Sequence, residues 1–464
     1  MTRRVSALPL LLLVLAGCAS LRPGAPAGPK YIIIYIADGA GAAHFELARQ
    51  ASLHLRGRDL AIVERVFQAG TTGVMTTHAR GALTTDSAAA ATAMSTGVKT
   101  RGGMIATTPE GDRLATALQA AQLHGKRIGI VTTAAVTDAT PAAFAVHATS
   151  RGDYPTIVDG YLRLAPDVIL GGGAAYFLPQ SAAGVRRDGR DAIAEFRSRG
   201  YAILRTRADL GAPQNGVPGR LLGLFAAGDL GHEIDRHETG EPSLAELTEV
   251  ALRSLAHDDG RGFVLLVENE AVDSASHAND VAALIHDLWA FDRAVEVGLA
   301  FRTRAPGETL IVVTSDHETG GLSPTLTRSP DGKGVVIASP EHLALLSHIT
   351  ISLNRAAETL GPNPTPAALE SLLVRHFAGF VMDTDLRHVI DRQEPFDPVF
   401  RLATQSALAR MIARRTGLYW ATGAHASDPV PVGAVGPGAE RFRGWLDNTD
   451  FGRALHHLIR ARDD

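Results

Sequence analysis

The sequence places a serine directly before a run of alanines, in the stretch Thr84–Ala93. Alanine favours the helix more than any other residue, so Ser87 is expected at or near the first turn of a helix. Unpaired backbone N–H groups and the helix dipole favour an anion at that end, which would place the Ser87 hydroxyl beside a bound negative group. Asp86 and Ser87 are also ordinary helix-capping residues, so the stretch alone does not decide between the two interpretations.

Carboxylates and histidines occur in pairs further along the chain. Asp273 and His277 are four residues apart, a spacing that places both on one face of a helical turn, and Asp316 and His317 are adjacent. Oxygen and nitrogen donors of this kind suit Zn²⁺. One such pair is often only a surface hydrogen bond, but two pairs with further donors predict a site for several metal ions. The further donors stand at strand ends or beside glycines: Asp38, Glu268 and His425.

Short apolar strands are the elements that must position these residues. The run Tyr31–Ile36 is apolar and rich in β-branched residues without alternation, which is typical of a strand buried on both faces of a parallel sheet. Four similar runs end in polar or glycine-rich turns: 127–133, 167–170, 263–267 and 309–313. Strand–turn–helix units in this order predict an α/β fold with a doubly wound, mostly parallel central sheet flanked by helices. Ligands bind at the carboxyl edge of such sheets.

Two stretches interrupt this repeat. Residues 154–248 are expected to hold one or two sheet elements and a polar, glycine-rich surface portion. Residues 326–418 are expected to be largely helical and to form an insertion that caps the domain. The chain then returns to the core at 423–438.

Bulk composition narrows the class of protein. A chain of 464 residues is long enough for one large domain with insertions or for two domains. With 45% hydrophobic and 20% charged residues it matches a soluble globular protein rather than a fibrous or disordered one. The net charge of −4 and the scattered Lys and Arg residues argue against nucleic acid as a binding partner.

The N-terminal segment resembles a bacterial lipoprotein signal. Arg3 and Arg4 precede the apolar stretch 8–15, and Leu15–Cys18 has the residues expected around a lipid-modified cysteine. We therefore expect residues 1–18 to be a signal peptide, Cys18 to become the lipidated mature N-terminus, and 19–30 to be a flexible tether to a folded domain at 31–464. The protein would then be exported to the periplasm or the cell surface and held on the membrane only by lipid. An ordinary secretory signal with an incidental cysteine is the alternative.

Several motifs together resemble those of the alkaline phosphatase family, in the family's order. They are Thr85–Ala88, Asp138–Ala143, Val267–Glu268 with Asp273–Asp280, Ser315–Gly321 and His425–Gly438. The resemblance extends from about residue 31 to residue 452. Asp38–Gly41 departs from the family's usual Asp-Gly-Met-Gly but keeps the carboxylate.

The resemblance implies an activity and the residues that carry it. It implies a phosphate monoester hydrolase with an alkaline optimum, which forms a covalent phosphoserine at Ser87 and releases inorganic phosphate. It also implies two Zn²⁺ and one Mg²⁺ per subunit and a homodimer. Arg151 would bind the phosphate. The implied ligands are Asp273, His277 and His425 for one zinc; Asp38, Asp316 and His317, joined by Ser87, for the other; and Asp38, Thr140 and Glu268 for magnesium, with Asp138 positioning a water.

The chemistry of these residue types agrees with the implied reaction. Metal coordination lowers the pKa of a serine hydroxyl, and two cations about 4 Å apart stabilise the entering and leaving oxygens of an in-line displacement. The planar guanidinium of Arg151 suits two phosphate oxygens at once. A phosphodiesterase or another ester hydrolase of the same superfamily stays open as an alternative. A non-catalytic surface lipoprotein would need no nucleophile and is disfavoured. Other histidines are expected to be surface or helix-end residues: His44, His54, His78 and His124.

Overall fold

The computed structural model describes residues 28–211, 219–256, 260–329, 332–400 and 402–461. The expected signal peptide, with Cys18, and most of the expected tether lie outside these residues. Among the described residues, no helix combines the length and the apolar character that crossing a membrane requires.

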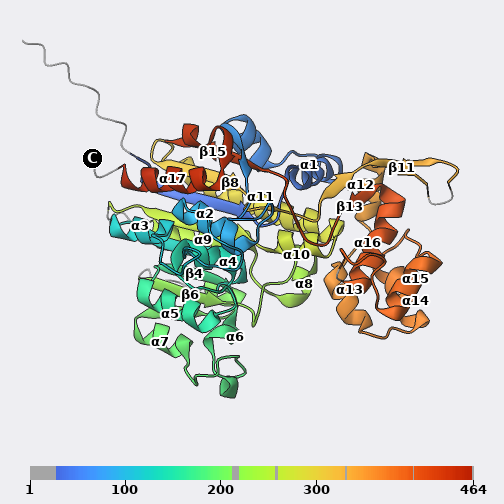
Figure 1. Cartoon of the computed structure of the whole chain (residues 1–464), viewed down its shortest axis with the longest axis horizontal. Coiled ribbons are helices and arrows are strands. Elements are labelled where there is room, and N and C mark those ends of the chain that lie inside the picture. The colour runs from blue at the N-terminus through green and yellow to red at the C-terminus, as the bar shows by residue number, and fades with distance from the viewer. Residues whose placement is uncertain (1–27, 212–218, 257–259, 330–331, 401, 462–464) are drawn as a thin grey trace, which may run out of the picture.

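A ten-stranded sheet forms the centre of the described chain (Figure 1). Its strands lie in the order β16-β2-β15-β8-β1-β7-β3-β4-β6-β5, and all run parallel except β15, which pairs antiparallel with both β2 and β8. The strands are β1 (Tyr31–Ala37), β2 (Thr71–Thr76), β3 (Arg127–Ala135), β4 (Val168–Gly172), β5 (Tyr201–Leu204), β6 (Arg220–Leu224), β7 (Phe263–Asn269), β8 (Thr309–Thr314), β15 (Val430–Val435) and β16 (Gly444–Asp447). The expectation of a doubly wound, mostly parallel sheet is confirmed.

Helices cover both faces of the sheet because its central strands are apolar on both sides. In β1, Ile32 and Ile34 pack into one core, whereas Ile33 and Tyr35 pack into the other. The first core lies under α2 (Ser87–Thr96), α3 (Ala117–Leu123), α4 (Ala139–Ala145), α5 (Tyr154–Leu164), α7 (Ala192–Ser198) and α17 (Asn448–Arg460). The second lies under α1 (Ala42–Arg56), α9 (Leu244–Leu255) and α11 (Val281–Arg302). The unbroken hydrophobic run at 31–36 therefore reports burial from both sides.

Residues 326–418 contain mostly helices, which lie at one end of the molecule in Figure 1. A short hairpin comes first, and five helices follow before β13 (Leu418–Trp420). The hairpin strands are β11 (Leu326–Arg328) and β12 (Val335–Ile337), and the helices are α12 (Pro340–Leu346), α13 (Leu353–Leu360), α14 (Pro366–His376), α15 (Thr384–Arg392) and α16 (Ala403–Thr416). Buried carboxylates join this part to the core, since Asp280 accepts a hydrogen bond from Leu353 N and Asp235 accepts one from Ser352 N at 3.0 Å.

One sequence expectation was wrong, and another leaves out the burial of a side chain. Residues 154–248 hold three sheet strands, β4, β5 and β6, rather than one or two. His44, expected to be a surface or helix-end residue, does lie near the start of α1, but its side chain is completely buried.

Candidate active site

Four neighbouring strands carry the candidate residues at their carboxyl ends. The order β8-β1-β7-β3 places the turn after β8 beside the turn after β1, and these beside the ends of β7 and β3. Asp38 follows β1, Glu268 is the second-last residue of β7, and Asp316 and His317 follow β8. Residues that are up to 279 positions apart in sequence, Asp38 and His317, are thereby brought to one edge of the sheet, where doubly wound folds bind their ligands.

Ser87 is the first residue of α2, as the run of alanines predicts. Asp86 caps this helix and accepts a hydrogen bond from Ala89 N at 3.0 Å, so Ser87 lies in the first turn with its hydroxyl directed into the site. Its Oγ is 3.2 Å from His317 Nε2, and the residue is only 3% exposed. The serine is thus buried beside the histidine rather than at the surface.

Asp38, Asp316 and His317 form a buried group whose ligand atoms converge. His317 Nε2 is 3.4 Å from Asp38 Oδ1 and 3.3 Å from Asp316 Oδ2. Gly39 makes the close approach of this turn possible: it has a φ of +74°, and a Cβ there would lie 2.5 Å from Asp273 Oδ1.

A second group joins Asp273 to the histidines. His277 Nε2 is 3.2 Å from Asp273 Oδ2 and 3.1 Å from His425 Nε2. The ring of His425 stacks on that of His317 with centroids 3.8 Å apart, and Asp273, His317 and His425 also have convergent ligand atoms. The two groups therefore share His317 and lie side by side.

Hydrogen bonds orient all three imidazoles in the same way. Nδ1 of His277 is 2.9 Å from the Gly423 carbonyl oxygen, and Nδ1 of His425 is 2.8 Å from the Thr85 carbonyl oxygen. A carbonyl oxygen only accepts, so each Nδ1 carries the proton. Thr319 Oγ1 donates to Asp273 Oδ1 and lies 3.2 Å from Nδ1 of His317, which makes this Nδ1 a donor too. In the neutral rings each Nε2 therefore turns a lone pair toward the carboxylates, the orientation of a metal ligand.

The buried carboxylates of the site need a cation to balance their negative charge. Asp38 Oδ1, Glu268 Oε1 and Asp316 Oδ2 are buried and accept no hydrogen bond from the described residues. Burial and the neighbouring carboxylates raise the pKa of Asp38 well above its usual value, and burial is also the largest cause that raises the pKa of Asp316 to about 7. Oxygen donors crowded against imidazole lone pairs fit divalent metal ions, whose charge would offset the repulsion.

Thr140, Glu268 and Asp138 lie on the β7–β3 side of Asp38. Thr140 Oγ1 is 3.5 Å from Asp38 Oδ2, and Glu268 Oε2 accepts a hydrogen bond from Thr132 Oγ1. Burial, followed by the charge of Asp138, raises the pKa of Glu268 to about 8. This side offers only oxygen donors, the type that Mg²⁺ prefers.

Arg151 is tied to the residue that precedes Ser87. Its Nη1 is 3.5 Å from Asp86 Oδ2, its Nη2 is 3.0 Å from Asp138 Oδ1, and its backbone N–H donates to the Gly103 carbonyl oxygen at 2.7 Å. The Arg151 side chain is 36% exposed, so it remains accessible to an incoming anion. The structure thus brings together every candidate residue of the sequence analysis that lies in the described chain.

Two residues of the site were missed by sequence reasoning. Thr319 holds Asp273 and the ring of His317, and its only sequence signal is its position two residues after His317. His44 accepts from Gly41 N–H at Nδ1 and donates from Nε2 to the Thr319 carbonyl oxygen, both at 3.1 Å. It thereby joins the turn after β1 to the turn after β8.

Known proteins resemble this chain in sequence and in structure. The family model for alkaline phosphatase matches residues 29–460. Alkaline phosphatase 3 of Bacillus subtilis (strain 168) is 30% identical, with 94% of this chain and 90% of that protein covered. Streptomycin-6-phosphate phosphatase of Streptomyces griseus is 32% identical, with 95% and 93% covered. The crystal structure of Thermus thermophilus alkaline phosphatase superposes with a TM-score of 0.83 at 30% identity and covers 97% of this chain and 96% of that one.

The family match covers nearly the whole described chain, and the residues at the carboxyl edge of the sheet form one connected site. The chain belongs to the alkaline phosphatase family, whose enzymes hydrolyse phosphate monoesters.

Proposed function

We propose that the chain hydrolyses phosphate monoesters through a covalent phosphoserine at Ser87, with an alkaline optimum. The observation that carries the proposal is the position of the Ser87 hydroxyl, which is buried at a helix N-terminus 3.2 Å from His317 Nε2. A nucleophile needs a group that activates it and a group that holds its target, and both surround Ser87.

The residues divide into three parts by the donors that they offer. Asp273, His277 and His425 would hold one Zn²⁺, and Asp38, Asp316 and His317 would hold a second with Ser87. Asp38, Thr140 and Glu268 would hold Mg²⁺, with Asp138 beside them. When bound, such cations supply Lewis acidity that lowers the pKa of the serine hydroxyl and neutralises the oxygens of the displacement. His317 belongs by its geometry to both candidate groups, and its imidazole sets their spacing.

In the first step the Ser87 oxygen attacks phosphorus, and the bond from phosphorus to the ester oxygen breaks. The alcohol leaves and phosphoserine remains. In the second step water attacks the phosphoserine, which restores Ser87 and gives inorganic phosphate. Arg151, held by Asp86 and Asp138, binds the non-bridging oxygens throughout. Its two donors fit a terminal dianionic phosphate better than the single charge of a diester, which favours the monoesterase over the phosphodiesterase alternative.

A substrate panel tests this function. A chromogenic phosphate monoester, the matching diester and the matching sulfate should be offered to the protein with Zn²⁺ and Mg²⁺ across neutral to alkaline pH. We expect hydrolysis of the monoester above all, rising toward alkaline pH and lost on chelation. Faster hydrolysis of the diester or the sulfate would refute the proposal.

We also propose export with a lipid on Cys18, because the signal motif precedes a domain in which the described residues include no membrane-spanning helix. Replacement Cys18→Ser should yield active protein that no longer pellets with membranes. A variant that still pellets would show that another feature anchors the protein.

A further inference from the structure

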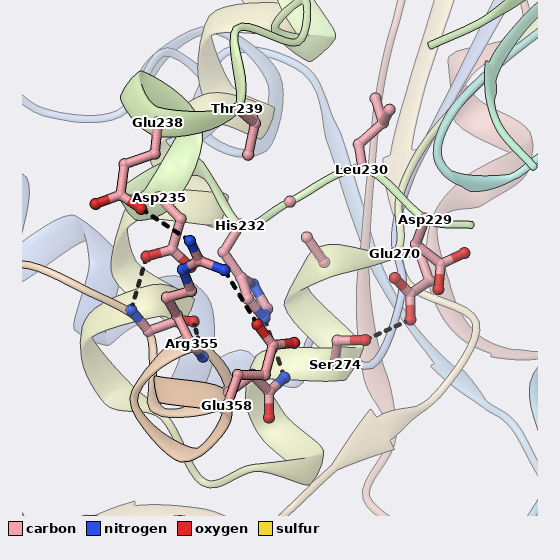
Figure 2. Close-up of a pocket in the computed structure, with 14 residues that line it drawn as sticks. Asp229, Leu230, His232, Asp235, Glu238, Thr239, Glu270, Ser274, Arg355 and Glu358 are labelled. Carbon is pink, nitrogen blue, oxygen red and sulfur yellow. Dashed lines mark hydrogen bonds and ion pairs between the residues drawn. The ribbon is translucent and has the colours of Figure 1, made fainter. Parts of the chain in front are cut away.

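A cavity of about 370 Å³ lies between α10 (Ala271–His277) and the segments that contain α8 (Arg236–Thr239) and α13 (Figure 2). Glu270 and Ser274 form one wall, and Arg355 and Glu358 of α13 form the opposite wall. Its volume is in the range of sites that bind small molecules.

The cavity adjoins the candidate active site through shared elements. Ser274 lines the cavity, and its neighbour in α10 is Asp273 of the site. Asp229 lines the cavity as well, and its Oδ1 accepts a hydrogen bond at 2.7 Å from Ala135 N–H at the end of β3, three residues before Asp138. The alcohol part of an ester held at Ser87 must extend away from the metal-ligand groups, and this cavity is a neighbouring space with room for it.

Carboxylates outnumber cationic groups in the cavity walls, because among the described residues that form them only Arg355 and His232 are cationic, and His232 Nδ1 is 2.7 Å from Asp287 Oδ2, to which its charge is paired. Five carboxylates line the cavity: Asp229, Asp235, Glu238, Glu270 and Glu358. The guanidinium of Arg355 lies 3.3 Å from Glu238 Oε2 and 3.3 Å from Glu358 Oε2. Its positive charge is therefore paired with these two carboxylates, at the end of the cavity away from α10.

At the end beside α10, the two carboxylates are paired only with neutral donors. Glu270 Oε1 accepts from Ser274 Oγ at 2.8 Å, and Asp229 accepts from the backbone of Ala135. Neither makes an ion pair with any cationic side chain of the described chain. A positive group of a ligand placed here would supply the cationic partner that Glu270 and Asp229 lack.

We propose that the cavity binds a cationic group, an ammonium or a guanidinium, on the alcohol part of the phosphate monoester, and that Glu270 and Asp229 determine this specificity. The proposal rests on the proposed function of the neighbouring site. Charge-assisted hydrogen bonds from an ammonium to Glu270 would favour such esters, whereas an apolar alcohol would leave the carboxylates uncompensated.

The test compares ω-aminoalkyl phosphates, from ethanolamine phosphate to 6-aminohexyl phosphate, with n-alkyl phosphates of the same length. We expect kcat/KM to be about tenfold higher for the best aminoalkyl ester than for its alkyl partner, mostly through KM, and the advantage to fall with added salt. Glu270→Gln keeps the size of the side chain and an acceptor for Ser274 but removes the charge. It should lower the ratio several-fold while kcat/KM for the alkyl ester stays the same.

Two matched variants complete the design. Asp229→Asn should lower the same ratio, and it provides a second reading should Glu270→Gln fail to fold. Glu308→Gln is the control, because Glu308 is an exposed carboxylate before β8, at the opposite edge of the sheet. In this variant the ratio of kcat/KM between aminoalkyl and alkyl esters should be unchanged. Equal kcat/KM for both ester series in the unmodified protein, or an unchanged ratio in both Glu270→Gln and Asp229→Asn, would overturn the proposal. Failure to hydrolyse alkyl esters at all would instead refute the proposed function.

Discussion

At the scale of single residues, the hydrogen bonds made by Nδ1 of the histidines fix how their rings are oriented in the site. His277 and His425 each donate from Nδ1 to a backbone carbonyl oxygen, so each presents Nε2 to Asp273. Thr140 differs, because its hydroxyl is 3.5 Å from the nearest Asp38 oxygen and offers a single weak donor atom. The two residues should therefore contribute unequally to the reaction.

His425→Ala should cost more activity than Thr140→Ala. The imidazole supplies a nitrogen ligand whose loss would weaken a zinc site, whereas a hydroxyl is a weak and replaceable magnesium ligand. We expect a loss of kcat of at least about a hundredfold for His425→Ala and a several-fold loss for Thr140→Ala, both measured with saturating Zn²⁺ and Mg²⁺. Equal losses after saturation would contradict separate zinc and magnesium sites.

At the scale of elements, the structure shows a link between two turns of the site, made by His44, that the sequence did not predict. Its ring is buried, packs against Trp420 with centroids 5.6 Å apart, and bonds to backbone groups of the turns after β1 and β8. These two turns carry Asp38, Asp316 and His317, so the relative position of the candidate ligands depends on this link.

His44→Phe keeps the ring but removes both hydrogen bonds. Leaving the Gly41 N–H and the Thr319 carbonyl oxygen unpaired should lower the free energy of unfolding by about 1–3 kcal/mol per group. Chemical denaturation measures this loss, and equilibrium titration with Zn²⁺ should show weaker binding. His54→Phe, at an exposed position of the same helix, is the control and should change neither quantity. Zinc affinity unchanged in His44→Phe would show that the link does not position the ligands.

The sequence predicts the elements whose signals are local. The apolar run of β1 and the alanines after Ser87 indicate their elements without knowledge of distant residues, and both are confirmed. β2 and β16 were not predicted because they are short and partly exposed, and because β2 pairs with β15 and β16, which lie hundreds of residues away. The burial and the contacts of His44 were not predicted for the same reason, since the Thr319 carbonyl that pairs with its ring is 275 positions distant.

The candidate site was largely predictable because its donors stand at strand ends. Asp38, Asp316 and His317 follow apolar runs directly, and a parallel sheet brings such ends together. The cavity beside α10 was not predictable, because its walls come from the segment after β6, from α10 and from α13. The packing of α13 against the core supplies one of these walls.

For the whole molecule, the buried carboxylates should make the stability of the metal-free protein depend on pH. Folding raises the pKa of Asp316 to about 7 and of Glu268 to about 8, so the folded state holds protons that the unfolded chain has released. Stability must then fall as pH rises toward about 8. Burial lowers the pKa of His44 from 6.5 to about 4, which makes stability rise with pH between these two values. Above pH 6.5 this opposing effect is complete.

Thermal unfolding of chelator-treated protein between about pH 6.5 and 8 measures the effect. We expect the midpoint to decrease across this window, and the stabilisation by added Zn²⁺ and Mg²⁺ to increase, because the ions bind the deprotonated carboxylates. A metal-free midpoint that rises with pH would contradict the account of the buried cluster.

The most direct test of the central claim is to locate the phosphate on the protein. The protein should be incubated with a phosphate monoester at mildly acidic pH, where the attack of water on the intermediate is slow, then quenched and analysed by peptide mass spectrometry. The account predicts one phosphorylated residue, Ser87, and none in a Ser87→Ala variant that retains its unfolding midpoint. Phosphate on any other residue, or trapping that persists in Ser87→Ala, would contradict it.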